Sequence, residues 1–470
     1  MRKNWKIGLC CAVVLLGAAV GYALWTDAYA PIDAERILAN SKLNGRTFKG
    51  EVVEIQADNN LLHAYLMEEH SVPLAAISFG FDKAGTAYEP KDGVALLTES
   101  VLLDGAGRFS RKELRETMKE KGIKLAVSAG NDRLTFSLSF VKKFEKEALE
   151  ILKAVLYDAH FKKEDIDLAR RQLAMLKQQQ KESPQYQLNR LMDKTFYGEH
   201  PYAKEGIPDD AVLAKVSVQD MRDYLKQFMA KNTLSIGIAG DMDRAESEAF
   251  LTQVFAGLND ASKGVDLPEF KPDWNASKVA EVSDISAQSL IMLKSLGVPR
   301  LDDDFYPLLL ADYVFGGAGL SSRLSLAVRE NEGLTYGIYS FLTSDDTGDF
   351  WQIYFSTTPD NTARIFDLLN QEYEKFYREG LSQHELDVAK SSLLSSFNLR
   401  FSSVAVIAEM LEQMQVQKLG IDFLKNRQNQ VKEVTLEQVN DAIRRRLPKT
   451  LKEGDGARVF EIVGAAQKNN

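Results

Sequence analysis

The segment Ser321–Ile338 has the sequence SSRLSLAVRENEGLTYGI, and the rest of the chain is interpreted outward from it. It follows a glycine-rich turn, and its pattern predicts a helix that carries Arg329. Three apolar positions suit one buried face of that helix: Leu324, Leu326 and Val328. Gly333 is placed to end the helix, and Tyr336, seven residues after Arg329, opens a predicted strand. On these residues alone, the simplest interpretation is structural, with Arg329 in an ion pair and Tyr336 packed in a strand.

The second half of the chain repeats the order of predicted elements found in the first half. Ile166–Arg170 recurs as Leu386–Lys390 after 220 residues, and a capped helix start at Ser217 recurs at Thr435 after 218 residues. Each half runs through strands, a helix, a strand pair, a long helix, the capped helix and a strand. The first strand pair is predicted around Gly130–Asn131. Chance similarity of two α/β segments is the alternative, because the matching runs are short.

This repetition predicts an α+β fold class with two tandem homologous domains, each a mostly antiparallel sheet packed with helices. The predicted division places the first domain at residues 51–256, a linker at 257–274 and the second domain at 275–465. A chain of 470 residues exceeds the size of a single hydrophobic core, which is consistent with two domains. Residues 31–50 form a polar lead-in.

Residues 1–30 have the pattern of an export segment. Basic residues at its start precede an uncharged apolar run, Ile7–Trp25, and small residues follow around Ala28 and Ala30. The segment is either a cleaved signal peptide or an uncleaved membrane anchor, since the apolar run is long enough to span a bilayer. Either way, we expect the bulk of the chain to lie in the periplasm, free or anchored in the inner membrane. Any membrane contact is expected only through this segment.

Composition excludes several classes of function. The formal net charge of −9 argues against a nucleic-acid-binding protein, which usually carries a basic face. Both cysteines, Cys10 and Cys11, lie in the export segment, so the exported part has no disulfide, thiolate metal site or cysteine nucleophile.

Two stretches of the chain are informative together: EEHSVPLAAISFGFDKAGTAYEPKDGVALLTESVLLDGAG, at residues 68–107, and FGGAGLSSRLSLAVRENEGLTYGI, at residues 315–338. They resemble the M16 family of zinc peptidases, the insulinase, pitrilysin and processing-peptidase family. The second stretch has the family's glycine-rich turn, its S-S-R-L run, and an arginine followed seven residues later by a tyrosine. The resemblance extends over roughly residues 50 to 465 and includes the tandem domains.

The family's zinc site is the helical motif H-x-x-E-H, with two histidine ligands, a glutamate general base and a distal glutamate ligand. In this sequence Leu96 and Ser100 stand at the histidine positions, and Glu99 alone is retained. The distal ligand position falls on Leu176 or Lys177, neither of which suits zinc. None of the five histidines forms a pair at helical spacing, so no metal site and no cofactor are predicted in this chain. A metal-free catalytic role for Glu99 is disfavoured, and it is expected to face a polar cavity.

The resemblance implies a mechanism divided between domains and between chains. Zinc is expected in a partner subunit that has an intact H-x-x-E-H motif, and Arg329 and Tyr336 would be the catalytic residues that this chain supplies to the heterodimer. By family analogy, the peptide substrate would add to the edge strand Leu125, Ala126, Val127 and Ser128. The main expectation is therefore a non-zinc subunit of an exported peptidase. Two alternatives stay open: a catalytically inactive binding or scaffold protein, and a self-sufficient peptidase with a non-standard site.

Overall fold

The computed structural model describes residues 50–464 except 265, 273, 275–277, 346, 400, 402 and 452–455. The predicted export segment and nearly all of the lead-in lie outside the described residues. Among the described residues, no helix combines the length and apolar character that a membrane span requires.

The first half is built on a six-stranded sheet with the order β1-β2-β8-β3-β7-β6. Only the β2–β8 pair is parallel. The strands are β1 (Val53–Ala57), β2 (Leu62–Glu68), β3 (Leu74–Asp82), β6 (Lys124–Ala129), β7 (Arg133–Val141) and β8 (Leu234–Gly240). The predicted strand pair around Gly130–Asn131 is confirmed as the β6–β7 hairpin, which places β6 at the edge of the sheet.

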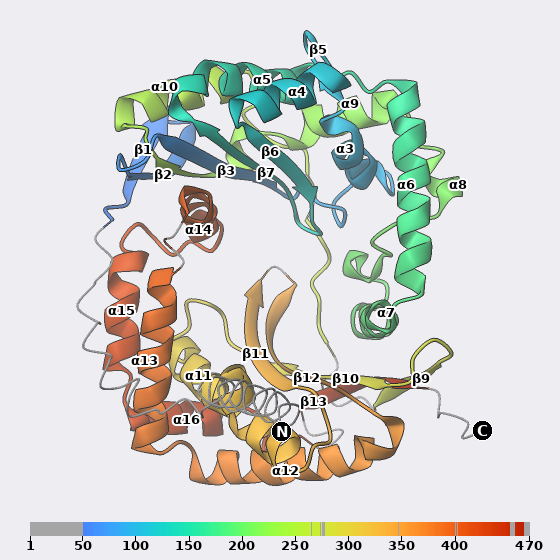
Figure 1. Cartoon of the computed structure of the whole chain (residues 1–470), viewed down its shortest axis with the longest axis vertical. Helices are drawn as coiled ribbons and strands as arrows, with labels where there is room; N and C mark the ends of the chain where they lie inside the picture. The colour runs from blue at the N-terminus through green and yellow to red at the C-terminus, as the bar shows by residue number, and fades with distance from the viewer. Residues whose placement is uncertain are drawn as a thin grey trace, which may run out of the picture.

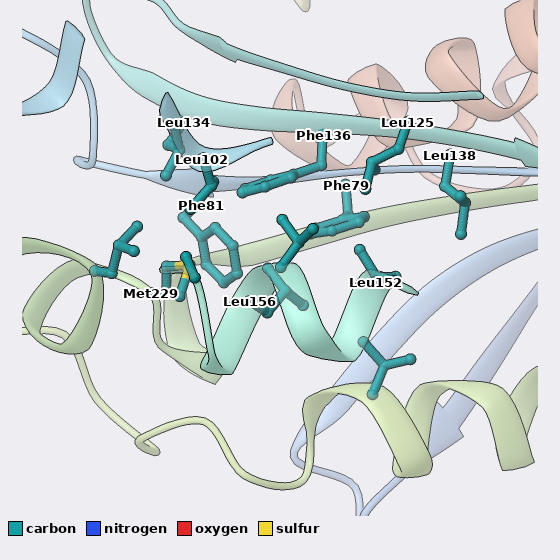
Figure 2. Close-up of a cluster of buried hydrophobic side chains, with 14 of the residues drawn as sticks. Phe79, Phe81, Leu102, Leu125, Leu134, Phe136, Leu138, Leu152, Leu156 and Met229 are labelled. Atoms are coloured by element: carbon teal, nitrogen blue, oxygen red, sulfur yellow. The ribbon is translucent and has the colours of Figure 1, made fainter. Parts of the chain in front are cut away.

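Helices cover one face of this sheet and enclose the first core (Figure 1). Those over the face are α3 (Val94–Leu102), α4 (Arg111–Lys121), α5 (Glu145–Tyr157), α9 (Val218–Phe228) and α10 (Arg244–Phe255), with a small ribbon of β4 (Gly105–Ala106) and β5 (Phe109–Ser110). Helices α6 (Lys163–Lys181) and α8 (Asp210–Leu213) stand at the side of this layer. Alternate strand residues point into this core, where the Phe79 and Phe136 rings stack at a centroid distance of 4.8 Å. Figure 2 shows these rings close to Leu152 and Leu156 of α5.

The second half contains a five-stranded sheet with the order β11-β12-β10-β13-β9, in which only β9 and β13 pair in parallel. Its strands are β9 (Val279–Ser283), β10 (Ser289–Leu296), β11 (Ile338–Asp345), β12 (Gly348–Thr357) and β13 (Ala457–Gly464). Its helices are α11 (Phe305–Asp312), α12 (Thr362–Glu379), α13 (Gln383–Leu399), α15 (Phe423–Glu433) and α16 (Leu436–Arg446). The α+β fold class is confirmed, with two mostly antiparallel sheets packed against helices. The exact domain boundaries stay a prediction.

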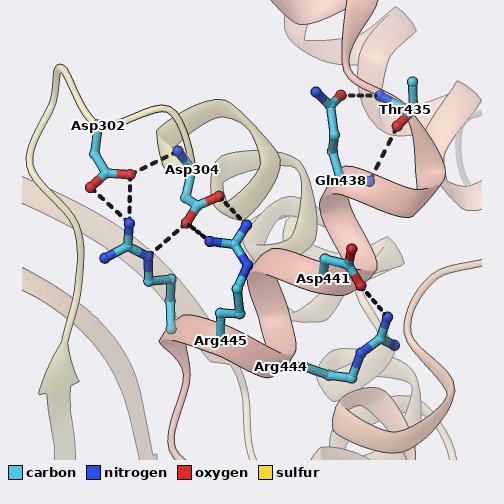
Figure 3. A network of polar contacts seen from close by, with 8 residues as sticks. Asp302, Asp304, Thr435, Gln438, Asp441, Arg444 and Arg445 are labelled. Atoms are coloured by element: carbon cyan, nitrogen blue, oxygen red, sulfur yellow. Dashed lines mark hydrogen bonds and ion pairs between the residues drawn. The ribbon is translucent and has the colours of Figure 1, made fainter.

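Capping chemistry repeats between the halves, as the sequence predicts. Ser217 and Asp220 form a capping box at the start of α9, and Thr435 and Gln438 form another at the start of α16 (Figure 3). The far end of α16 is tied to the start of α11 by ion pairs. The Asp304 carboxylate accepts hydrogen bonds from Arg445 and Arg446 at distances between 2.6 and 2.8 Å. These contacts hold the outer helices of the second half together.

Each half also sends one helix onto the other half's sheet. Helix α14 (Val404–Val416), from the second half, packs on β2, β8 and β3 of the first sheet, whereas α7 (Pro184–Tyr197), from the first half, packs on β9, β10 and β13 (Figure 1). The first residues of α7 and α14 are 220 positions apart, the same offset as the repeat found between the long helices. The two helices are therefore counterparts that cross reciprocally between the halves.

The contact of α14 with the first sheet is unusually close because glycine lies beneath it. A Cβ atom on Gly237 of β8 would lie 2.0 Å from the carbonyl oxygen of Ala408. The Gln415 side chain accepts a hydrogen bond from the Ile236 backbone N–H at 2.8 Å. Glu412 is 2% exposed and forms an ion pair with Arg133 of β7 at 2.8 Å. Packing and charge pairing together fix α14 on the inner face of the sheet, which is the face opposite the first core.

Candidate functional site

The Ser321–Ile338 segment begins beside strand β11. Gly316, in the preceding π-helical segment Tyr313–Gly317, allows this approach, because a Cβ atom there would lie 2.5 Å from the Ser340 backbone nitrogen. The predicted helix is present over Ser325–Glu330, but its geometry is π-helical instead of α-helical. Leu324 and Val328 are fully buried as predicted, whereas Leu326 is 48% exposed, so its predicted place on the buried face was wrong. Leu326 is two positions from both Leu324 and Val328, and residues two positions apart on a helix point to opposite sides.

Gly333 ends the helix as predicted. Its φ is +66°, and its N–H donates to the carbonyl oxygen of Arg329 at 3.0 Å. Tyr336 does not open the following strand, since β11 begins at Ile338. Tyr336 instead lies in the connecting segment with an exposed fraction of 84%. The prediction that Tyr336 is a strand residue was wrong. The structural interpretation, in which Tyr336 packs within a strand, was wrong for the same reason.

Arg329 and Arg323, six residues apart in the same segment, have different environments. The Arg323 side chain is 17% exposed, and its guanidinium forms a bidentate pair with Glu385 at 2.7 and 2.8 Å and donates to the Gly380 carbonyl. This pair helps lower the pKa of Glu385 to about 2 against the opposing effect of burial. Arg329 is 31% exposed, and among the described residues its guanidinium contacts only the adjacent Glu330, at 3.0 Å. Arg323 is therefore the structural arginine of this segment, and Arg329 keeps donors available for another group.

Helix α3 carries the degenerate motif near the edge of the first sheet. Its first turn is capped by Glu89, whose carboxylate accepts the backbone N–H groups of Gly93 and Ala95 at 2.8 and 2.9 Å. Burial raises the pKa of Glu89 to about 7. Leu96 is half-buried against the first core, and the Ser100 hydroxyl donates back to the Leu96 carbonyl at 2.8 Å. The two positions thus share a helix face, as ligands at i and i+4 must, but neither side chain can take the place of a histidine ligand.

Glu99 has a structural contact that the sequence did not predict. Burial raises its pKa, while a hydrogen bond from the Ala129 backbone N–H acts in the opposite direction. Ala129 is the last residue of β6, so the retained glutamate holds the end of the edge strand against α3.

The predicted substrate strand is present as β6. It pairs with β7 on one side and stands last in the strand order of the described sheet. Leu125 is buried in the core and Val127 is half-buried against it, whereas Ala126 and Ser128 are exposed on the opposite face. The edge that peptide addition requires is therefore present, and whether a peptide binds there stays a prediction.

The two candidate positions of the distal zinc ligand are occupied by a leucine and a lysine. Leu176 is 49% exposed on α6, and the buried Lys177 pairs with Asp209 at 2.7 Å and with Glu205. Within the residues that the structure describes, no group of three or more histidine, cysteine, aspartate or glutamate side chains lies close enough together to hold a metal ion. Neither the ligand types nor the local charge at α3 and α6 fit zinc.

Sequence reasoning missed the acidic residues that α14 places beside β6. Glu409 and Glu412, with the neutral Gln413, line a cavity together with Ala126 and Ser128. The 220-residue repeat could have predicted α14. Pro184 marks the start of α7, and the equivalent position 220 residues later is Val404, the first residue of α14.

Comparisons with known proteins agree with this geometry. A family model described as Insulinase (Peptidase family M16) matches residues 67–207, and one described as Peptidase M16 inactive domain matches residues 215–393. The Helicobacter pylori protein described as non-peptidase homolog YmxG is 23% identical over 384 residues, covering 80% of this chain and 87% of that protein. An uncharacterized zinc protease YmxG of Bacillus subtilis is 21% identical over 315 residues, covering 66% of this chain and 75% of that protein.

Solved structures show the same fold. A crystal structure of a peptidase M16 inactive domain from Pseudomonas fluorescens has a TM-score of 0.79 and 25% identity, covering 89% of this chain and 99% of that one. The periplasmic protease PqqL from Escherichia coli has a TM-score of 0.74 and 14% identity, and the match covers 89% of this chain and 47% of PqqL. The inactive-domain matches and the non-peptidase relative support a catalytically inactive M16-like protein. With both M16 models matched in tandem and the fold shared along nearly its whole described length, the chain belongs to the M16 peptidase family.

Proposed function

We propose that this chain is the non-zinc subunit of an exported two-chain M16 peptidase. In this assignment a partner with an intact H-x-x-E-H motif holds zinc and its activated water, and this chain supplies Arg329 and Tyr336. Zinc lowers the pKa of its bound water and polarises the peptide carbonyl. This chain contributes the groups that bind the substrate and the developing negative charge.

The observation that carries the proposal is the contrast between Arg323 and Arg329. Arg323 donates to Glu385 and Gly380 through Nε and Nη2, whereas the partly exposed Arg329 contacts, within the described part of the chain, only its neighbour Glu330. A guanidinium offers a rigid fork of donors that suits a peptide carbonyl or carboxylate. The Tyr336 ring, 84% exposed, offers a hydroxyl donor for an oxyanion.

Localisation follows from the sequence pattern of residues 1–30, which favours export to the periplasm with cleavage or anchoring. One protein of the same fold, PqqL, is described as a periplasmic protease, which is compatible with that assignment.

The test requires the zinc-bearing partner, which is sought by pull-down from the exported fraction with metal analysis. The purified chain alone is expected to bind no stoichiometric zinc and to cleave no peptide. In the reconstituted pair, Arg329→Ala or Tyr336→Phe should lower kcat about 10²- to 10³-fold, as loss of a transition-state donor does elsewhere. Arg378→Ala is a matched arginine control, since Arg378 likewise pairs with its adjacent glutamate, Glu379, and lies outside the Ser321–Ile338 segment. Wild-type kcat in both site variants would refute the proposal.

The second candidate function is a binding or scaffold protein without a role in hydrolysis. It is favoured by the lost ligand positions at Leu96 and Ser100 and by the description of the Helicobacter pylori relative as a non-peptidase homologue. A pull-down that recovers partners without an H-x-x-E-H motif, together with no metallopeptidase activity in the complex, would select this alternative.

A further inference from the structure

The helical layer of the first half contains a cavity that the proposed function does not use. It has a volume of about 300 Å³ and lies between the end of α5, the end of α9 and residues 257–259. Figure 1 shows α5 and α9 on the far side of the first sheet from α14, so the sheet separates this cavity from α14. Its volume is at the lower end of the range for small-molecule sites. We call this cavity the outer pocket.

The floor of the outer pocket is apolar. Its aliphatic side chains are between 4% and 7% exposed, and they are Leu156, Leu225, Met229 and Leu258. Phe161, which is 5% exposed, adds an aromatic ring to the same lining. An alkyl chain that enters the pocket exchanges contact with water for contact with these side chains. Each methylene group that is fully buried in this way tightens binding by about fourfold.

Two cationic side chains lie at the rim of the outer pocket. Arg222 and Lys226 are both exposed and are four positions apart on α9, so their side chains share one face of the helix. The Arg222 guanidinium lies over the Phe161 ring, with 5.4 Å between Cζ and the ring centroid, and donates to the Ala159 carbonyl at 3.3 Å. In the described part of the chain, neither cation has an ion pair with a carboxylate.

The charge of the outer pocket is opposite to that of the whole chain. The formal net charge of the chain is −9, yet the described residues that line the pocket include no aspartate or glutamate. The positive charge of Arg222 and Lys226 is therefore not neutralised within the lining. An anionic group that approaches the rim is attracted by both side chains.

The walls of the outer pocket are held in place by hydrogen bonds. The Tyr157 hydroxyl donates to the Val254 carbonyl at 2.7 Å, and burial raises the pKa of Tyr157 to about 12, so this donor stays protonated. The Asn259 side chain donates to the Lys226 carbonyl at 2.7 Å, and the Lys231 N–H donates to the Asn259 carbonyl at 2.9 Å. A ligand thus meets a preformed site, which reduces the entropy lost on binding.

We propose that the outer pocket binds a medium-chain alkyl carboxylate. The carboxylate lies between Arg222 and Lys226, and the alkyl chain lies on the apolar floor. A guanidinium presents several donors to a carboxylate, and the ammonium group adds a second positive charge. Because the pocket has one cationic rim and one apolar floor, it matches a ligand with one anionic head and one uncharged tail. The site goes beyond the proposed function, since it requires neither zinc nor a zinc-bearing partner.

The experiment measures binding of hexanoate, octanoate and octanamide to the exported chain by isothermal titration calorimetry. Octanoate is expected to bind about tenfold tighter than hexanoate, because it buries two more methylene groups. Octanoate is also expected to bind about tenfold tighter than the uncharged octanamide, since each of two exposed cations supplies a factor of up to about fivefold. Added salt should reduce the difference between octanoate and octanamide but not the difference between octanoate and hexanoate.

Two variants assign the preference for the carboxylate to residues. Arg222→Gln and Lys226→Gln should each weaken octanoate binding by about three- to fivefold and leave octanamide binding unchanged. Both side chains are exposed, so neither substitution removes core packing. Arg171→Gln is the matched control, because Arg171 is an exposed arginine on α6 that does not line the pocket. It should leave the affinities for all three probes unchanged.

Three results would each overturn the inference: equal binding of octanoate and octanamide, an octanoate affinity that both Arg222→Gln and Lys226→Gln leave unchanged, and absence of saturable octanoate binding. Equal affinity for hexanoate and octanoate would also contradict it, since the apolar floor would then not hold the chain. Arg329→Ala should bind octanoate as the wild-type chain does. Failure of the subunit proposal, detected as full activity of Arg329→Ala in a reconstituted pair, is therefore distinct from failure of the carboxylate site.

Discussion

Replacement of Gly237 by alanine should displace α14 from the first sheet. The new Cβ atom would lie 2.0 Å from the Ala408 carbonyl oxygen and 2.5 Å from the Glu412 backbone nitrogen. Ordinary contacts between such atoms lie at about 3.5–4.0 Å, so α14 must retreat by roughly 1.5 Å. Leu411 and Met414, which are 0% and 1% exposed, would then lose packing against the sheet. Since the obstructing atoms belong to the backbone, we expect the upper end of overpacking costs, about 3 kcal/mol.

Hydrogen exchange followed by mass spectrometry is the appropriate assay, because it reports the opening of α14 separately from the rest of the chain. A cost of about 3 kcal/mol should accelerate exchange in α14 by about 100-fold where exchange occurs through local opening. Gly130→Ala is the matched control, since its Cβ would meet its nearest atom at 3.7 Å. Unchanged hydrogen-exchange protection of α14 in Gly237→Ala would refute the inference that α14 packs directly against the backbone of β8.

Three further predictions follow from the ion pairs and caps. Glu412→Ala should destabilise the fold by about 3–5 kcal/mol in urea unfolding, because it leaves the buried Arg133 without its partner on α14. Asp304→Asn should destabilise by about 2 kcal/mol at pH 7. Burial works to raise the pKa of Asp304, but hydrogen bonds from Arg446 and Arg445 hold this pKa below the ordinary value of 3.8. The stabilisation by Asp304 is therefore present above about pH 4 and is lost as the pH falls through the folded-state pKa. The difference between wild type and Asp304→Asn in urea should therefore shrink at acid pH, and a constant difference would contradict the assignment. Thr435→Ala should cost about 1 kcal/mol of unfolding free energy, since it removes the α16 cap, whereas Ser396→Ala on the exposed part of α13 should cost much less.

The fold class was predictable because its signals are local. The β6–β7 hairpin follows from the Gly130–Asn131 turn between alternating strands, and the starts of α9 and α16 follow from the capping residues Ser217 and Thr435. Turn residues and caps act through hydrogen bonds within a few positions of themselves, so sequence spacing is sufficient to find them. Gly333 was predictable for the same reason, as a residue that adopts positive φ without strain.

The candidate site was only partly predictable. Residue identity located Arg329 and Tyr336 and excluded zinc ligands at Leu96 and Ser100. Residue identity did not predict the π-helical turn or the position of Tyr336 ahead of β11. The exposure of Leu326 follows from helical spacing, since Leu326 is two positions from the buried Leu324 and Val328. Helical geometry over a few residues depends on how the segment packs against its neighbours, and that packing overrides periodicity.

By itself, the sequence determined the repeated α+β organisation, the loss of metal-ligating side chains and the presence of the Arg329 and Tyr336 pair. These depend on side-chain chemistry and on contacts between residues close in the chain. Only the tertiary structure decided that α7 and α14 cross between the halves, that Arg323 takes the structural ion pair, and that Glu409 stands beside β6. Such features join residues far apart in the chain, 62 positions even for the Arg323–Glu385 pair. Long-range packing chooses among placements that the local sequence leaves equally favourable.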